Sequence, residues 1–105
     1  MENKEKKFNL AKELHQSGKI SEAQEIYLDL LKEQENDKLY FLLGTSYLQL
    51  KQFDKAIEYL NRSIEINPNL PNSYNNRGIV FSELKKFEKA IIDYDKVISL
   101  NPKFL

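Results

Sequence analysis

The chain has 105 residues, with 16 basic and 16 acidic side chains, one histidine and no cysteine. This length suits a single domain, and the balanced charge removes the usual argument for a nucleic acid or an anionic membrane surface as partner. Without cysteine there is no disulfide or zinc–thiolate site, and no apolar run predicts a signal peptide or a membrane span, so we expect a cytoplasmic protein.

Two amphipathic helices are predicted at the start of the chain. Apolar residues recur at helical spacing within residues 3–17, and Gly18 then breaks the pattern. Ser21 predicts the start of the second helix, because serine is favoured at the N-terminus of a helix. The apolar positions are Leu10, Ala11 and Leu14 in the first helix and Ala23, Ile26, Tyr27, Leu30 and Leu31 in the second.

Four more helices are predicted after these. The third, 38–51, is apolar almost all round, so we expect it in the middle of the structure. The fourth, 53–66, ends before Pro68, because proline lacks an amide hydrogen and disfavours helix in the residue before it. The fifth covers 71–84 and begins with a proline, and the sixth covers 87–100. Six helices joined by short turns predict an all-α array of helical hairpins.

The sequence of residues 37–70 is repeated, with changes, in residues 71–104. A shift of 34 residues gives 11 identities, where chance gives about two for ordinary composition. The identical pairs are Tyr40/Tyr74, Gly44/Gly78, Leu50/Leu84, Lys51/Lys85, Phe53/Phe87, Lys55/Lys89, Ala56/Ala90, Ile57/Ile91, Ile64/Ile98, Asn67/Asn101 and Pro68/Pro102. A fixed period of this size is typical of stacked units held together by neighbour contacts, so function is expected on exposed faces.

At these positions the chain resembles the tetratricopeptide repeat family. That family's repeat has an aromatic residue early in its first helix, a small residue one turn later, a second aromatic, an alanine in the second helix and a closing proline. The places are filled by Tyr40, Gly44, Tyr47, Ala56 and Pro68, and again by Tyr74, Gly78, Phe81, Ala90 and Pro102. The resemblance implies a right-handed α-solenoid of three helix-turn-helix repeats, at about 4–36, 37–70 and 71–104, in one domain of residues 1–105.

The first unit departs from this pattern. Lys7 stands in the place of the aromatic residue and Glu35 in the place of the proline, and the offset to the second unit is 33, one residue short at the junction. In the other two units, Gly44 with Ala56 and Gly78 with its alanine are expected to let the helices of a hairpin approach closely. A leucine at such a crossing would overpack it, at a cost of about 1–3 kcal/mol.

The resemblance also implies that the first helix of each hairpin lines a concave groove. The candidate groove residues are Phe8, Lys12 and His15 in the first unit, Phe41, Thr45 and Leu48 in the second, and Asn72, Asn75 and Ile79 in the third. Most of them are apolar or polar without charge, which suits an extended or helical peptide from a partner protein. The alternative for Phe41 and Leu48 is that they pack within the array.

Members of the family that bind chaperone tails clamp a C-terminal carboxylate with lysine, asparagine and arginine side chains. The corresponding places here hold Phe8, Lys12, Leu42, Asn72 and Asn76. Without converging cations a carboxylate loses its charge-assisted hydrogen bonds. We therefore do not expect this chain to have the clamp.

No catalytic, metal or cofactor site is predicted. One histidine with no cysteine beside it does not complete a zinc site, so His15 is expected to be a solvated residue at the groove edge. No nucleophile motif and no glycine-rich phosphate loop is present. The predicted function is that of a non-enzymatic protein-binding module.

The last helix differs from the first in its outward face. Part of its apolar surface, at Ile91, Ile98 and Leu100, would pack on a following helix, whereas repeat arrays usually end in a polar cap. We hypothesise that the chain self-associates through this end or is the N-terminal part of a longer protein. The alternatives to a peptide-binding module are therefore a homo-oligomeric assembly element and the regulatory end of a larger enzyme.

Overall fold

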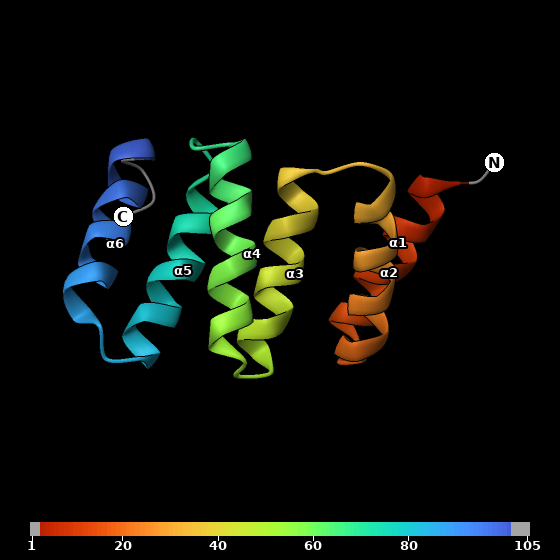
Figure 1. Cartoon of the computed structure of the whole chain (residues 1–105), viewed down its shortest axis with the longest axis horizontal. Coiled ribbons are helices and arrows are strands. Elements are labelled where there is room, and N and C mark those ends of the chain that lie inside the picture. The colour runs from red at the N-terminus through yellow and green to blue at the C-terminus, as the bar shows by residue number, and fades with distance from the viewer. Residues whose placement is uncertain (1–2, 102–105) are drawn as a thin grey trace.

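Six α-helices follow one another in the described part of the chain, residues 3–101, and they pair as three hairpins in a row (Figure 1). The helices are α1 (Lys4–Gln16), α2 (Ile20–Glu33), α3 (Asp37–Gln49), α4 (Phe53–Ile66), α5 (Pro71–Glu83) and α6 (Phe87–Leu100). The computed structural model thus confirms the predicted all-α array. The closing proline predicted for the third repeat, Pro102, lies outside the described residues.

Helix lengths repeat from hairpin to hairpin. The first helices, α1, α3 and α5, have 13 residues each, and the second helices, α2, α4 and α6, have 14 each. Helix α3 begins at Asp37, 33 residues after the start of α1, and α5 begins at Pro71, 34 residues after α3. The first connection between hairpins, residues 34–36, is therefore one residue shorter than the second, residues 67–70, as predicted.

The turn inside each hairpin has the same backbone conformation. Gly18, Lys51 and Lys85 stand at equivalent places with φ angles of 86°, 61° and 62°. In each turn the next amide returns to a carbonyl near the end of the first helix, in the pattern of a Schellman motif. These bonds are Lys19 N–Leu14 O (2.9 Å), Gln52 N–Tyr47 O (2.9 Å) and Lys86 N–Phe81 O (2.7 Å). The left-handed residue reverses the chain tightly enough for the second helix to start two residues later.

The start of α2 differs from its prediction. Helix α2 begins at Ile20, and Lys19 precedes it without a side-chain cap, so the prediction that Ser21 starts the helix is wrong. The turn at Gly18 has already directed the backbone into the helix, and the Ala23 amide bonds the Lys19 carbonyl at 3.1 Å. By contrast, α3 has a side-chain cap, because the Asn36 side chain accepts hydrogen bonds from two amides of the first turn.

The hydrophobic core runs along the row in two clusters. The first joins the first hairpin to α3 and contains Ala11, Ala23, Tyr27, Leu30, Leu39 and Leu43. The second joins α4 to α5 and contains Ala56, Leu60 and Val80. Helix α3 contacts α2, α4 and α5, which confirms its predicted place in the middle.

Gly44 and Gly78 lie where the two helices of a hairpin come closest. A Cβ added to Gly44 would lie 2.7 Å from the Leu60 Cγ, and one added to Gly78 would lie 2.7 Å from the Tyr94 Cε1. The predicted close approach is confirmed, but the nearest side chains are not the alanines. Side chains lean toward the N-terminus of their own helix, so the residue one turn after each alanine covers the glycine.

The row of helices measures 44 × 24 × 22 Å, with α1 and α6 at opposite ends (Figure 1). None of the helices within residues 3–101 is both long enough and apolar enough to cross a membrane.

Candidate functional site

Polar side chains link the first helices of the three hairpins to one another. Asn76 of α5 donates a hydrogen bond to the Thr45 hydroxyl of α3 at 2.8 Å. The Nε2 atom of His15 in α1 lies 2.6 Å from the Oε1 atom of Gln49 in α3. These contacts place side chains of α1, α3 and α5 on one shared face of the array, here called the groove face.

Two hollows open between α1 and α3 on this face. One has a volume of about 330 Å³ and is lined by Lys12, His15, Gln16, Tyr27, Leu42 and Gln49. The other has a volume of about 230 Å³ and is lined by Lys4, Glu5, Phe8, Leu30, Gln34, Asn36, Lys38 and Leu39. Both combine apolar walls with amide and ammonium groups, and the smaller one also has the Glu5 carboxylate in its lining.

His15 is half-buried and joins three helices, so the prediction of a solvated side chain is wrong. Its Nδ1 atom lies 3.0 Å from the Tyr27 hydroxyl of α2, and its Nε2 atom lies against Gln49 of α3. In the tautomer whose Nε2–H donates to the Gln49 oxygen, Nδ1 accepts from the Tyr27 hydroxyl. Burial raises the pKa of the Tyr27 phenol to about 12, which keeps this donor protonated. The two partners of His15 come from helices far apart in the sequence.

The groove face is more closed between α3 and α5. Phe41 and Leu48 are half-buried there and pack against the core cluster that contains Val80. The Thr45 hydroxyl is already occupied by Asn76. The sequence left open whether Phe41 and Leu48 line the groove or pack within the array. In the structure each packs against the core and each remains partly exposed.

The nine candidate groove residues thus fall into two groups. Phe8, Lys12 and His15 line the two hollows between α1 and α3. The other six line neither hollow; Asn72 is exposed, and the rest are half-buried: Phe41, Thr45, Leu48, Asn75 and Ile79. Four further lining residues come from α3: Lys38, Leu39, Leu42 and Gln49. Of these, the sequence reasoning missed Leu39 and Leu42 as residues that line a hollow.

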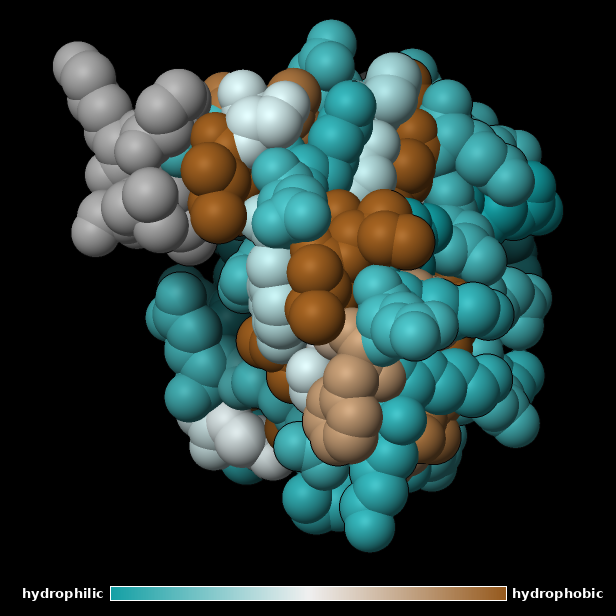
Figure 2. Space-filling model, turned by 90° about the vertical axis from the view of Figure 1, so that its left-hand side faces the viewer, coloured by the Kyte–Doolittle hydropathy of each residue, from teal (hydrophilic) through white to brown (hydrophobic). Residues whose placement is uncertain are grey.

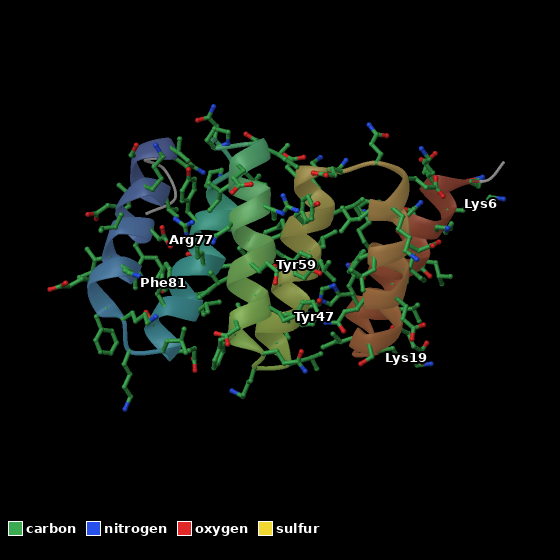
Figure 3. The ribbon with its side chains drawn as sticks, viewed as in Figure 1. Lys6, Lys19, Tyr47, Tyr59, Arg77 and Phe81 are labelled. Carbon is green, nitrogen blue, oxygen red and sulfur yellow. The ribbon has the colours of Figure 1, made fainter. Side chains whose placement is uncertain are left out.

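A buried ion pair distinguishes the third hairpin. Arg77 of α5 donates to both carboxylate oxygens of Asp93 in α6, at 2.9 and 2.7 Å, and to the Asn61 oxygen of α4 at 2.8 Å. Asp93 is 2% exposed, and its hydrogen bonds raise the pKa of Arg77. Figure 3 shows Arg77 in the part of the array formed by these helices. Sequence reasoning missed the pair, although Arg77 and Asp93 replace Leu43 and Tyr59 of the second hairpin.

The positions of the chaperone-tail clamp carry little positive charge in the structure. Lys12 is the one cation among the five residues at those positions, and its ammonium group lies over the Phe8 ring, 4.6 Å from the centroid. Asn76 is engaged with Thr45. The groove face therefore has no cluster of cations at these five positions.

A larger hollow lies on the other side of the array, between α2 and α4. Its volume is about 800 Å³. The stacked rings of Tyr40 and Tyr59, with centroids 6.1 Å apart, form part of its wall. The Tyr59 ring also stacks on that of Tyr47, outside the lining, with centroids 5.6 Å apart (Figure 3). Charges of both signs surround it, from Glu25, Asp29, Lys32, Glu58 and Arg62. The Tyr59 ring at its wall is already stacked on two other rings, which makes this hollow a weaker candidate for peptide binding than the groove face.

Within residues 3–101, no group of three His, Asp or Glu side chains gathers in a geometry that would hold a metal ion. The arrangement on the groove face offers apolar contact and hydrogen bonds, which is the chemistry of binding.

Two proteins of known sequence resemble part of the chain. An NADPH oxidase activator of Dictyostelium discoideum is 38% identical over 74 residues, covering 70% of this chain and 12% of that protein. The photosystem I assembly protein Ycf3 of Rippkaea orientalis (strain PCC 8801 / RF-1) is 34% identical over 68 residues, covering 61% of this chain and 39% of that protein. The chain therefore spans well under two thirds of either relative.

Solved structures match the whole array. MamA superposes with a TM-score of 0.91 at 27% identity, over 97% of this chain and 60% of that chain. The first TPR domain of Spaghetti (RPAP3), bound to the HSP90 peptide SRMEEVD, superposes with a TM-score of 0.88 at 27% identity, over 91% of this chain and 77% of that chain.

A family model described as tetratricopeptide repeat matches the chain twice, at residues 38–70 and 71–104. No match covers the first hairpin, whose sequence lacks the aromatic residue and the proline of the pattern. The structure nevertheless gives this hairpin the same helix lengths and the same turn as the other two. The chain belongs to the tetratricopeptide repeat family.

Proposed function

We propose that the chain is a non-enzymatic binding module that holds a peptide segment of a partner protein along the groove face, between α1 and α3. The observation that carries the proposal is the pair of hollows in that gap, whose walls combine apolar side chains with amide groups. The similar Spaghetti domain was solved with a peptide bound, which supports a peptide as the ligand class.

The lining chemistry favours a particular kind of peptide. Phe8, Leu39 and Leu42 offer apolar contact, so each hollow suits an apolar side chain of the ligand. Gln16 and Gln49 supply amide donors and acceptors that match the backbone groups of an extended chain. The hollows lie side by side along α1, so the ligand would present its two apolar residues a few positions apart.

An acidic peptide tail suits this groove poorly. The HSP90 peptide bound by the Spaghetti domain, SRMEEVD, carries three carboxylate side chains. The five clamp positions of this chain supply a single ammonium group, that of Lys12. Because charge-assisted hydrogen bonds supply much of the affinity for carboxylates, we expect SRMEEVD to bind weakly or not at all.

The proposal is tested by selecting ligands from a displayed library of random peptides and titrating them calorimetrically. Selected peptides should carry two apolar residues without an acidic C-terminal motif. The double variant Lys12→Ala/Gln16→Ala should weaken them at least about tenfold, because both side chains line the larger groove hollow. Glu88→Ala, an exposed change on α6, is the matched control and should leave affinity unchanged.

Two results would overturn the proposal. The first is tight binding of SRMEEVD with no selected apolar peptide. The second is a selected peptide whose affinity is insensitive to the Lys12/Gln16 change and to Leu42→Ser, with circular dichroism showing that both variants are folded.

A further inference from the structure

Three polar side chains from three helices form one hydrogen-bonded chain at the larger groove hollow. The Tyr27 hydroxyl of α2 lies 3.0 Å from Nδ1 of His15, and Nε2 of His15 lies 2.6 Å from Oε1 of Gln49 in α3. All three residues line the hollow of about 330 Å³. The positions of the hydrogens in this chain therefore decide which groups of Gln49 are left for a ligand.

The buried end of the chain is Tyr27. Its side chain is fully buried, and among residues 3–101 its hydroxyl has no hydrogen-bond partner besides His15. A buried hydroxyl hydrogen without an acceptor is costly, which favours donation from the phenol to Nδ1. A neutral imidazole that accepts at Nδ1 carries its hydrogen on Nε2. Burial of Tyr27 thus selects one tautomer of His15.

The open end of the chain is Gln49. With a hydrogen on Nε2 of His15, the atom of Gln49 that faces it has to be the amide oxygen, and the amide nitrogen points elsewhere. Gln49 is exposed, and within the described residues 3–101 no group accepts a hydrogen bond from this nitrogen. Lys12 adds an ammonium group to the same lining. The hollow therefore offers a ligand mainly donors on this side.

The equivalent place at the second junction lacks this chain. Leu48 and Leu60 stand there in the places of His15 and Tyr27. Neither leucine side chain donates or accepts a hydrogen bond, and Leu48 packs against the core. The polar chain is thus a feature of the junction at which the two groove hollows open.

We propose that His15 is a positioning residue that sets the sense of hydrogen bonding in the larger groove hollow. Held between Tyr27 and Gln49, His15 turns the Gln49 amide hydrogens toward the ligand, and the hollow selects an acceptor, the backbone carbonyl oxygen of an extended peptide. A backbone N–H at the same place would face a donor and stay unpaired, which lowers affinity. This assignment rests on the proposed function and adds which backbone group of the peptide meets α3.

The tautomer is measurable without any ligand. His15 is the only histidine in the chain, so long-range proton–nitrogen correlation NMR of the untagged chain reports on this ring alone. At about pH 8, above the range in which histidine ordinarily changes charge, the spectrum should show the hydrogen on Nε2. A hydrogen on Nδ1 would overturn the proposal.

The binding probe is a library-selected peptide that Lys12→Ala/Gln16→Ala weakens. This condition removes peptides that bind elsewhere. The main competing surface is the α6 end of the array, where exposed apolar side chains gather, Ile91 and Ile92 among them (Figure 2).

Gln49→Glu is the decisive change, because it replaces the amide hydrogens by an oxygen and keeps an acceptor for His15. It should weaken the probe at least about tenfold, since an acceptor then faces the peptide carbonyl. Gln52→Glu makes the same change at an exposed residue that lines neither hollow, and it should leave affinity unchanged. Equal or tighter binding to the Gln49→Glu chain would mean that the peptide donates at this place, and would overturn the proposal.

The peptide itself distinguishes a carbonyl from a carboxylate. Replacement of its carboxylates by carboxamides should leave affinity unchanged. A loss of about tenfold would make a carboxylate the acceptor, because charge-assisted hydrogen bonds are the stronger ones, and would overturn the assignment to a backbone carbonyl.

The positioning role of His15 is tested by two substitutions. His15→Gln keeps an amide donor for the Gln49 oxygen and should retain most of the affinity. His15→Leu removes the donor and should weaken the probe about three- to tenfold, because Gln49 is no longer oriented before binding. In a Gln49→Ala background, His15→Leu should have no further effect. An equal loss in both backgrounds would show that His15 acts only through the fold, and would overturn the proposal.

The two proposals fail in different ways. A peptide that Lys12→Ala/Gln16→Ala weakens and Gln49→Glu does not would overturn the role given to His15 and Gln49 and leave the proposed function standing. If no peptide responds to Lys12→Ala/Gln16→Ala, the proposed function is overturned, and the selection of a peptide carbonyl with it.

Discussion

Single residues explain how the third hairpin differs from the second. Arg77 and Asp93 form a bidentate ion pair where the second hairpin has an apolar residue and a tyrosine. A pair of this kind adds little net stability compared with apolar residues, but removal of one partner leaves the other charge uncompensated. The pair instead helps to fix the relative positions of three helices, because the guanidinium group of α5 bonds side chains of both α4 and α6.

The ion pair gives the first prediction. Asp93→Ala should lower the free energy of unfolding by about 3 kcal/mol, because Arg77 is then left half-buried without its partner. The double variant Arg77→Leu/Asp93→Tyr restores the residues of the second hairpin, Leu43 and Tyr59, and should recover most of that loss. Urea unfolding followed by circular dichroism measures both. Equal destabilisation by the single and double variants would show that the pair is not the cause.

Tyr27 gives a prediction on pH. Burial raises the pKa of its phenol from an ordinary value of 10.0 to about 12. The pKa is higher in the folded chain than in the unfolded chain. The contribution of Tyr27 to the free energy of unfolding is therefore fully present below pH 10 and is lost as the pH rises to about 12. The melting temperature should therefore fall across this range, and Tyr27→Phe should reduce the fall. An identical fall in the variant would assign the effect to other groups.

Residue types on the groove face were predictable, but their contacts were not. The repeat pattern places Phe8, Lys12 and His15 on the face of α1 that lines the hollows. Nothing in the local sequence indicates that His15 bridges Tyr27 and Gln49, because the three residues come from three helices. Such a bridge depends on how far apart the helices stand, which is a property of packing.

At the scale of the elements, the turns within the second and third hairpins hold a lysine in a strained backbone conformation. Lys51 and Lys85 adopt the left-handed conformation that glycine takes at the same place in the first hairpin. That conformation costs a residue with a Cβ about 1 kcal/mol. Replacement by glycine removes this cost, but part of the gain is offset because glycine loses more backbone entropy on folding.

Lys51→Gly and Lys85→Gly should therefore each stabilise the chain by about 0.5 kcal/mol, or about 2–4 °C in melting temperature. The reverse change, Gly18→Lys, should destabilise it by a similar amount. Differential scanning calorimetry of the three variants checks the pattern. A lower melting temperature for both glycine variants would mean that the lysine side chains stabilise the turns.

The two helix-crossing glycines should respond differently to alanine. A Cβ at Gly44 would lie 2.7 Å from the Cγ of fully buried Leu60 and 3.2 Å from its backbone nitrogen. A Cβ at Gly78 would meet the ring of Tyr94, which is half-buried and so less confined than Leu60. Gly44→Ala should therefore destabilise the chain by about 1–2 kcal/mol after the gain in helix propensity, and Gly78→Ala by less. Chemical unfolding ranks the two, and the opposite order would locate the tighter crossing in the third hairpin.

The helices themselves were largely predictable from the sequence. Their repeated spacing, the proline stops and the apolar positions agree with the observed bounds to within about two residues. The wrong start at Ser21 has a physical cause, since a Schellman turn delivers the chain directly into α2 and no side-chain cap is needed. Turn geometry of this kind depends on Gly18 more than on the residues that follow.

At the scale of the whole molecule, the two junctions between hairpins differ in how closely their side chains pack on the groove face. The first connection is one residue shorter than the second, and the two hollows of the groove face lie at this first junction. At the second junction, Asn76 bonds Thr45, and Phe41 and Leu48 pack against the core. The sequence shows the shorter connection but not the gap, because the distance between helices depends on all side chains at the interface.

Mapping by nuclear magnetic resonance tests the central claim most directly. The backbone amides of the chain are assigned, and a library-selected peptide is added until its signals saturate. The largest shift changes should fall on α1 and α3, around Phe8, Lys12, His15, Leu42 and Gln49, with little change on α2, α4 and α6. Shift changes that instead centre on the hollow around Tyr40 and Tyr59, or on α6, would contradict binding in the groove between α1 and α3.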